Sequence, residues 1–128
     1  MRAVLVVGLT ALVLAAAGCV SERSNATGPS SGSCSVSLSP SQFGSTVVAI
    51  DGFAFAPTPV RVRPGGKVTW VNCEPVGTPA HTSTADGGKW SSAPLEPGIT
   101  YTVTFDVPGT FVYHCEPHPF MTGEVIVE

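Results

Sequence analysis

Three side chains with metal-binding atoms lie close together near the end of the chain. Cys115, His118 and Met121 follow the spacing C-x2-H-x2-M, and a further imidazole, His81, lies far upstream in an irregular stretch. A thiolate, two imidazoles and a thioether form a soft, mixed donor set that selects copper over hard cations. We therefore predict one site for a single copper ion that alternates between Cu(I) and Cu(II), with His81, Cys115, His118 and Met121 as its ligands.

The alternative explanation for these residues is packing. A lone cysteine at a strand end is usually a small buried hydrophobic residue, and a lone methionine beside Phe120 usually fills the core. That explanation does not account for both of them flanking a histidine, with a second histidine upstream. The remaining histidine, His114, alternates with Cys115 along one predicted strand, so its side chain should point to the opposite face and should not be a ligand.

The segments that position these ligands read as short strands. Apolar and polar residues alternate after Ser35, and no stretch shows a helical period. Pro64-Gly65-Gly66 between two of the runs is typical of a hairpin turn. The pattern predicts an all-β sandwich or barrel, with strands over 60–63, 68–71, 101–105, 111–115 and 125–127.

Two segments do not fit this alternation. Residues 74–98 are long, weakly periodic and rich in Pro, Gly and Ser, and a loop of that length in a compact domain is usually functional. Residues 51–59 carry Phe53 and Phe55 in an extended setting. We interpret both rings as core residues.

The first residues read as a targeting segment. A positive start is followed by an apolar stretch over 3–17, which is too short for a membrane-spanning helix of about 20 residues. We predict a signal peptide over residues 1–18. Ala16-Ala17-Gly18-Cys19 resembles a bacterial lipobox, which predicts lipidation of Cys19 and anchoring to the outer side of the cell membrane. Plain secretion and a retained membrane anchor are the alternatives.

The rest of the chain divides into a tether and a domain. Residues 19–33 are rich in small polar residues and read as a flexible tether, and residues 34–128 form one folded domain. The chain has a net charge of -3 and 12% charged residues, which excludes the basic footprint of a nucleic-acid-binding protein. We expect a monomer.

Several further segments reinforce the copper interpretation. Together with the C-x2-H-x2-M-x-G run, they resemble the cupredoxins, the type 1 blue copper proteins of the plastocyanin and azurin kind, over residues 46–128, and the ligand spacing is most like that of the amicyanins. The segments are Phe55-Ala56-Pro57, Val62-Arg63-Pro64-Gly65, Val68-Thr69-Trp70-Val71-Asn72, Pro79-Ala80-His81 and Pro108-Gly109-Thr110-Phe111.

The resemblance carries expectations for fold and site. It implies a Greek-key β-sandwich of about eight strands, with His81, Cys115 and His118 binding copper in one plane and Met121 binding axially. It also implies that single electrons pass between redox proteins through the exposed edge of His118. Pro117, Pro119 and Phe120 would form an apolar rim for brief docking of these partners.

The chain departs from the family pattern beside the upstream histidine. Many cupredoxins have Asn directly after that histidine, whereas this chain has Thr82. A hydroxyl can take over part of the amide's role, but groups around the ligands tune a metal site, which leaves the reduction potential open. The loop from Asn72 to His81 is also longer than in the amicyanins and contains Cys73. We place Asn72 and Thr82 around the ligands.

Two cysteines remain after lipid and copper are assigned. Cys34 and Cys73 form an even pair in an exported chain, which predicts a disulfide between them. The competing interpretation makes Cys73 a metal ligand or a thiol for copper entry.

The sequence thus predicts an electron-transfer protein of the bacterial cell envelope. A copper chaperone or storage protein for an envelope enzyme is the alternative. Catalysis would need a further open metal site or cofactor, which three histidines in one domain cannot supply, so we do not expect an enzyme. A metal-free β-sandwich would leave the ligand set unexplained, and zinc at the same site would be redox-silent.

Overall fold

A computed structural model of the protein describes Cys34 and residues 44–128. The predicted signal peptide, Cys19 and the tether lie outside the described residues. Within the described part of the chain, no helix is long and apolar enough to cross a membrane.

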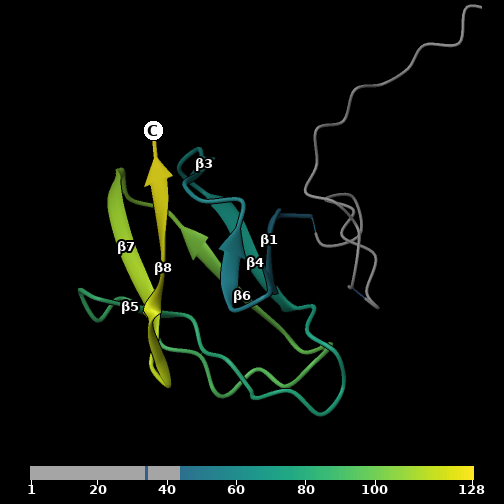
Figure 1. Ribbon diagram of the computed structural model, residues 1–128. Helices are drawn as coiled ribbons and strands as arrows, with labels where there is room; N and C mark the ends of the chain where they lie inside the picture. The colour runs from purple at the N-terminus through teal and green to yellow at the C-terminus, as the bar shows by residue number, and fades with distance from the viewer. Residues whose placement is uncertain (1–33, 35–43) are drawn as a thin grey trace, which may run out of the picture.

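The described residues form eight strands in two layers (Figure 1). The strands are β1 (Thr46–Asp51), β2 (Ala54–Ala56), β3 (Val60–Val62), β4 (Gly66–Asn72), β5 (Thr84–Ala85), β6 (Thr100–Phe105), β7 (Gly109–Cys115) and β8 (His118–Val127). One sheet has the order β2-β1-β4-β6 and the other the order β3-β8-β7-β5. β1 pairs with β4, and β3 with β8, in parallel, while the other neighbours are antiparallel. The predicted all-β sandwich is confirmed.

The core lies between the sheets and is rich in aromatic rings. Trp70 of β4 and Tyr113 of β7 are completely buried, with ring centroids 5.3 Å apart and nearly perpendicular planes. Val68 and Trp70 belong to this core, whereas Val71 belongs to a second cluster with Ala49. This split follows from the two-residue period of a strand, which sends successive side chains to opposite faces.

The second cluster is closed by the predicted disulfide. Cys34 and Cys73 are bonded across a sequence separation of 39 residues, and both pack with Ala49 and Val71. Cys73 directly follows β4, so the disulfide fixes the start of the long loop that carries His81. Its pairing removes Cys73 as a candidate metal ligand.

The turn at Pro64 does not form the predicted hairpin. The Gly66 amide donates to the Arg63 carbonyl at 2.8 Å, and Gly65 has a φ of 83°, as the third position of a type II turn requires. However, β3 pairs with β8 while β4 pairs with β1 and β6. The prediction was wrong because turn residues specify a chain reversal and not strand partners; here the chain crosses from one sheet to the other.

Candidate metal centre

Three of the four predicted ligands converge at one end of the sandwich. The donor atoms of His81, Cys115 and His118 all lie within 4.8 Å of one another. Cys115 Sγ is 3.7 Å from His81 Nδ1 and 3.5 Å from His118 Nδ1. Both imidazoles therefore present the same nitrogen to one buried, free thiol. The fourth, Met121, is buried in the same apolar cluster as Cys115.

A break in the pairing of β7 with β8 shapes the segment that carries Cys115, His118 and Met121. Cys115 pairs with His118, but the preceding His114 pairs with Thr122, so residues 119–121 have no partner on β7. A bulge of this kind bends a strand and re-aims its side chains. It leaves His118 half-buried at the tip of the hairpin and Met121 in the interior.

His81 is held by the loop between β4 and β5. Its backbone exchanges two hydrogen bonds with Leu95, at 3.2 and 2.7 Å. The completely buried Asn72 donates its side-chain amide to the Leu95 carbonyl at 2.7 Å, and its side-chain oxygen accepts from the Glu74 amide at 2.9 Å. Asn72 thus fixes the start of the loop at Glu74 and also bonds Leu95, the backbone partner of His81.

Thr82 connects this loop to the hairpin. Its amide donates to Cys115 Sγ at 3.3 Å, and its hydroxyl accepts from the Glu116 amide at 2.9 Å. The N–H directed at the sulfur helps to fix the position of the Cys115 side chain. The Thr82 hydroxyl thus forms a hydrogen bond between the loop and the hairpin, at a position whose role the sequence left open.

Glu74 is a neighbour of the site that the sequence analysis missed. Its carboxylate Oε1 lies 3.6 Å from His81 Nε2, a nitrogen with no hydrogen-bond partner among the described residues. Burial, and then the charge of His118, lower the pKa of His81 more than Glu74 raises it. The imidazole is therefore held neutral, the form that binds metals. Glu74 and His81 are seven positions apart, a spacing that predicts no contact in an irregular loop.

Phe53 was predicted to fill the core, and this prediction was wrong. The residue is 38% exposed, and its ring centroid lies 5.3 Å from that of His81 and 5.0 Å from that of His118. Phe55, by contrast, is a core residue as predicted. The difference arises because β2 begins at Ala54, so Phe53 belongs to a turn where strand alternation does not apply.

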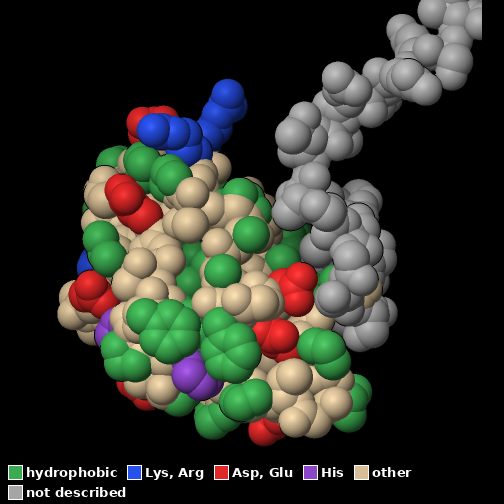
Figure 2. All heavy atoms as spheres, in the orientation of Figure 1, with side chains coloured by type: hydrophobic (Ala, Val, Ile, Leu, Met, Phe, Trp, Pro, Cys, Tyr) green, Lys and Arg blue, Asp and Glu red, His purple; other side chains and the backbone are tan. Residues whose placement is uncertain are grey.

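An apolar rim surrounds the exposed edge of His118. Pro117, Pro119 and Phe120 are all exposed, and Phe120 is 72% exposed. Figure 2 shows hydrophobic side chains gathered around a histidine at the lower end of the molecule, where the β7–β8 hairpin lies in Figure 1. Of the rim residues named from the sequence, Phe120 packs edge-on against His118, with ring centroids 6.0 Å apart.

The third histidine lies apart from the cluster. His114 Nδ1 is 2.6 Å from Asp86 Oδ1 at the surface, and the group of candidate metal ligands does not include it. This placement agrees with the strand-alternation argument.

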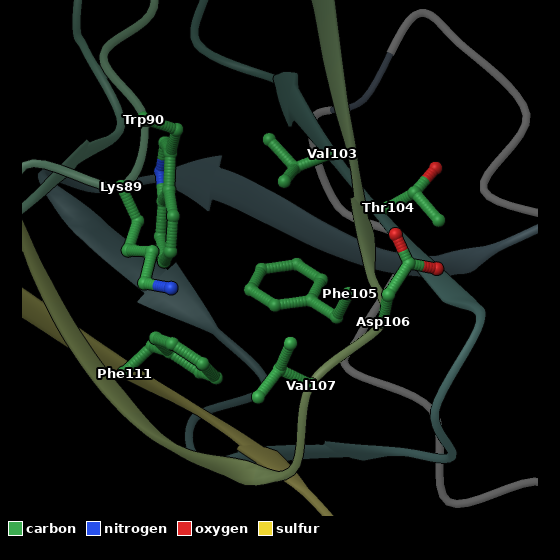
Figure 3. Close-up of a pocket in the computed structure, with 8 residues that line it drawn as sticks. All are labelled: Lys89, Trp90, Val103, Thr104, Phe105, Asp106, Val107 and Phe111. Atoms are coloured by element: carbon green, nitrogen blue, oxygen red, sulfur yellow. The ribbon is translucent and has the colours of Figure 1, made fainter.

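A shallow pocket of ≈ 180 Å³ opens elsewhere on the domain (Figure 3). The Lys89 ammonium lies 5.8 Å from the centroid of the Phe111 ring there. The lining contains no cysteine or histidine, so it offers no soft metal donors. Its residues are Lys89, Trp90, Val103, Thr104, Phe105, Asp106, Val107 and Phe111.

The residues at the cluster fit a copper ion. The thiol is buried and unpaired, two ring nitrogens face it, and a backbone amide points at the sulfur. This donor set of two nitrogens and one sulfur, with a thioether buried in the same cluster, matches the soft ligation that copper prefers.

Comparisons with known proteins agree with this geometry. Residues 43–128 match the family model of copper binding proteins, plastocyanin/azurin family. Amicyanin-alpha of Methylorubrum extorquens is 42% identical over 87 residues, which cover 66% of this chain and 73% of that protein. The structure of the Cu(I) form of an amicyanin variant is 34% identical, with a TM-score of 0.59 over 66% of this chain and 83% of that one.

A copper-containing nitrite reductase from Thermus scotoductus shares the fold. It is 26% identical with a TM-score of 0.61, but the match covers 66% of this chain and only 22% of the reductase. The family match spans most of the chain and includes all residues of the cluster. The chain therefore belongs to the copper-binding plastocyanin/azurin family, the cupredoxins, and its cofactor is copper.

Proposed function

We propose that this protein carries single electrons through one copper ion, which would be held by His81, Cys115, His118 and Met121. The observation that carries the proposal is the convergence of two Nδ1 atoms on one buried thiol. That arrangement, with a methionine buried nearby, is the ligand set of electron-transfer copper sites.

The surrounding residues keep the donors in place during electron transfer. Bound copper supplies a one-electron change between Cu(I) and Cu(II). Asn72 bonds Leu95, the backbone partner of His81, and Thr82 bonds the hairpin at Glu116. The fixed φ of Pro117 and Pro119 stiffens the hairpin. A donor set that does not rearrange lowers the barrier to gaining or losing an electron.

The electron would enter and leave through His118. Its half-exposed ring reaches the surface, whereas His81 is completely buried. The rim of Pro117, Pro119 and Phe120 offers a small apolar patch for brief docking of redox partners. The β3–β4 turn has three basic residues on or beside it, Arg61, Arg63 and Lys67. Figure 2 shows basic side chains at the end away from the exposed histidine. We therefore propose no nucleic-acid partner at the apolar rim.

We further propose that the protein acts outside the cytoplasm of a bacterial cell as a monomer. The signal-peptide pattern over residues 1–18 and the lipobox-like Cys19 support export and a lipid anchor, and residues 19–33 would tether the domain to the membrane. Mass spectrometry of the mature N-terminus should find a diacylglyceryl group on Cys19.

We assign no enzymatic activity to this chain. The likeness to nitrite reductase covers 22% of that enzyme, so a shared fold does not bring its activity with it. Across the described residues, a single group of three or more metal-ligating side chains is present. One such centre supports electron transfer without a second, substrate-binding metal.

The test is copper titration followed by voltammetry. We expect one equivalent of Cu(II) to produce an intense thiolate-to-copper absorption band, and reversible voltammetry with slow copper loss to a Cu(I) chelator. Rapid copper loss, or transfer to an apo-acceptor, would instead support a chaperone or storage protein. Phe120→Asp should slow electron transfer to a partner while leaving the band unchanged; loss of the band would make Phe120 structural.

A further inference from the structure

We propose that Phe53 is a positioning residue that clamps the His118 ring, and secondarily the His81 ring, with both Nδ1 atoms directed at Cys115. The inference rests on the proposed ligand set and adds a residue that no ligand spacing predicts.

Phe53 occupies an unfavourable backbone conformation. Asp51 of β1 pairs with Ala54 of β2, which leaves Gly52 and Phe53 as the two central residues of a hairpin turn. Their φ angles are 58° and 56°, and positive φ at both positions is the requirement of a type I′ turn. Glycine meets it without steric conflict, but a bulky side chain at positive φ is an outlier. Phe53 is the one non-glycine residue with positive φ in the described part of the chain.

The contacts of Phe53 point to the copper ligands and not to the core. Its ring is nearly perpendicular to both imidazoles, with interplanar angles of 88°. The two imidazole centroids are themselves 4.9 Å apart, so one phenyl ring packs against both. These distances lie in the range of favourable edge-to-face pairs. Strained residues persist when their surroundings over-determine them, and such residues cluster at functional sites.

The backbone of Phe53 is itself tied to the site. Its amide donates to Glu74 Oε1 at 2.9 Å, and the same oxygen lies 3.6 Å from His81 Nε2. A single buried carboxylate thus lies against both the turn and the back of one imidazole. The position of the phenyl ring is therefore coupled to the loop that carries His81.

The two histidines depend on this ring to different degrees. His81 is completely buried, so its rotamer is over-determined by its surroundings. His118 is half-exposed and lies on the hairpin, where its ring torsions have fewer restraints. Removal of the phenyl ring should therefore release His118 more than His81.

The experiment compares Phe53→Asn with wild-type protein. Asparagine tolerates positive φ, so the turn should survive without the ring. In the copper-free protein, NMR relaxation should show added motion of the His118 ring, with an unchanged or higher midpoint of thermal unfolding. In the Cu(II) protein, we expect a changed EPR hyperfine splitting and copper release to a chelator faster on the order of tenfold.

Two control variants complete the design. Phe53→Tyr keeps the ring and should behave as wild type. Val76→Ala removes a side chain that is 96% exposed in the loop that carries His81 and should leave His118 motion and copper release close to wild type. Unchanged His118 motion and copper release in Phe53→Asn would overturn the proposal. Added His118 motion together with a lowered midpoint of thermal unfolding would also overturn it, because the Phe53 ring would then stabilise the fold as a whole.

The same measurements separate this proposal from the proposed function. The absorption band of wild-type copper protein tests the function, and the difference between variant and wild type tests the role of Phe53. The NMR result on copper-free protein does not depend on the metal.

Discussion

The two histidines of the cluster bring the same ring nitrogen to one sulfur from opposite kinds of surroundings. His81 is completely buried in a loop between the two sheets, and its backbone is bonded to Leu95, whose carbonyl also accepts from Asn72. His118 is half-exposed on a hairpin within one sheet. Two residues of the same type therefore differ in their surroundings and not in their chemistry: the His81 loop fixes one side of the cluster, and the proposed contact with partners falls to the hairpin.

The stability of the two regions also has different origins. The His81 loop starts at a disulfide to Cys34 and depends on contacts between residues far apart in sequence. The hairpin is local, and Thr82 is its hydrogen-bonded link to the loop. Changes in the loop should therefore lower the stability of the fold, while changes in the hairpin should alter the spectrum and the electron-transfer rate.

The largest effect is expected where the two regions meet. Cys115→Ser should abolish the thiolate-to-copper absorption band completely, because no sulfur remains to donate charge. The matched control is His114→Ala, the neighbouring strand residue that lies outside the cluster, which should keep the band. A visible spectrum of each copper-loaded variant measures this; a band that persists in Cys115→Ser would remove Cys115 from the site.

The disulfide should dominate the stability of the His81 region. Replacing Cys34 and Cys73 together by alanine should lower the free energy of unfolding by about 4 kcal/mol, because the unfolded chain regains the entropy of a loop of this size. Chemical denaturation of the copper-free protein measures the loss. A decrease in the free energy of unfolding below about 1 kcal/mol would show that the disulfide contributes little to the stability of this region.

Asn72 tests the internal bracing of the same loop. Asn72→Ala removes the acceptor of the Glu74 amide and one of the two donors to the Leu95 carbonyl, which keeps the His81 amide. It should lower the free energy of unfolding by about 1–3 kcal/mol. Thr78→Ala is the control, because the Thr78 hydroxyl bonds Pro75 in the same loop but is exposed; it should cost less than about 1 kcal/mol. Equal losses in denaturation would contradict a special role for Asn72.

These three tests rest on residues that the sequence revealed to different extents. The candidate ligands could be named from residue type and spacing, because Cys-x2-His-x2-Met is local and soft donors rarely gather by chance. The disulfide followed from the even cysteine pair, and the core position of Phe55 from the general preference of aromatic rings for the interior. Each of these signals lies in a short segment or in a count.

The remaining features depend on three-dimensional arrangement. Phe53 could not be placed because alternation ends where a turn with positive φ begins, and Glu74 approaches His81 only because the loop folds back on itself. The turn at Pro64 was recognised, but turn residues do not state which sheet receives the next strand. The hydrogen bond from Glu116 to Thr82 likewise exists only once loop and hairpin meet.

Thr82 tests the link between the two regions. Thr82→Val keeps the shape of the side chain but leaves the Glu116 amide without its acceptor, which should cost about 1–2 kcal/mol and shift the reduction potential. Thr82→Ser retains the hydroxyl and should stay close to wild type. Denaturation and voltammetry measure the two effects; a Val variant that matches the Ser variant in both would show that the hydroxyl bridges nothing.

The smallest effect concerns pH in the copper-free protein. Burial lowers the pKa of His81 below its ordinary value of 6.5, so the unfolded chain takes up a proton at a pH where the folded chain does not. The stability that the neutral His81 ring provides is present above about pH 6.5. It is lost as the pH falls below the pKa of His81 in the unfolded chain towards its lower pKa in the folded protein. Denaturation at a series of pH values should show this decline, and His81→Gln should reduce it. An equal decline in His81→Gln would assign it to other groups.

One donor set should hold copper in both oxidation states, and X-ray absorption at the copper edge can measure this in the oxidised and the reduced protein. We expect a first shell of two imidazole nitrogens and one sulfur, with nearly the same distances in both forms. A shell that loses a nitrogen on reduction, or that contains oxygen in place of sulfur, would contradict it.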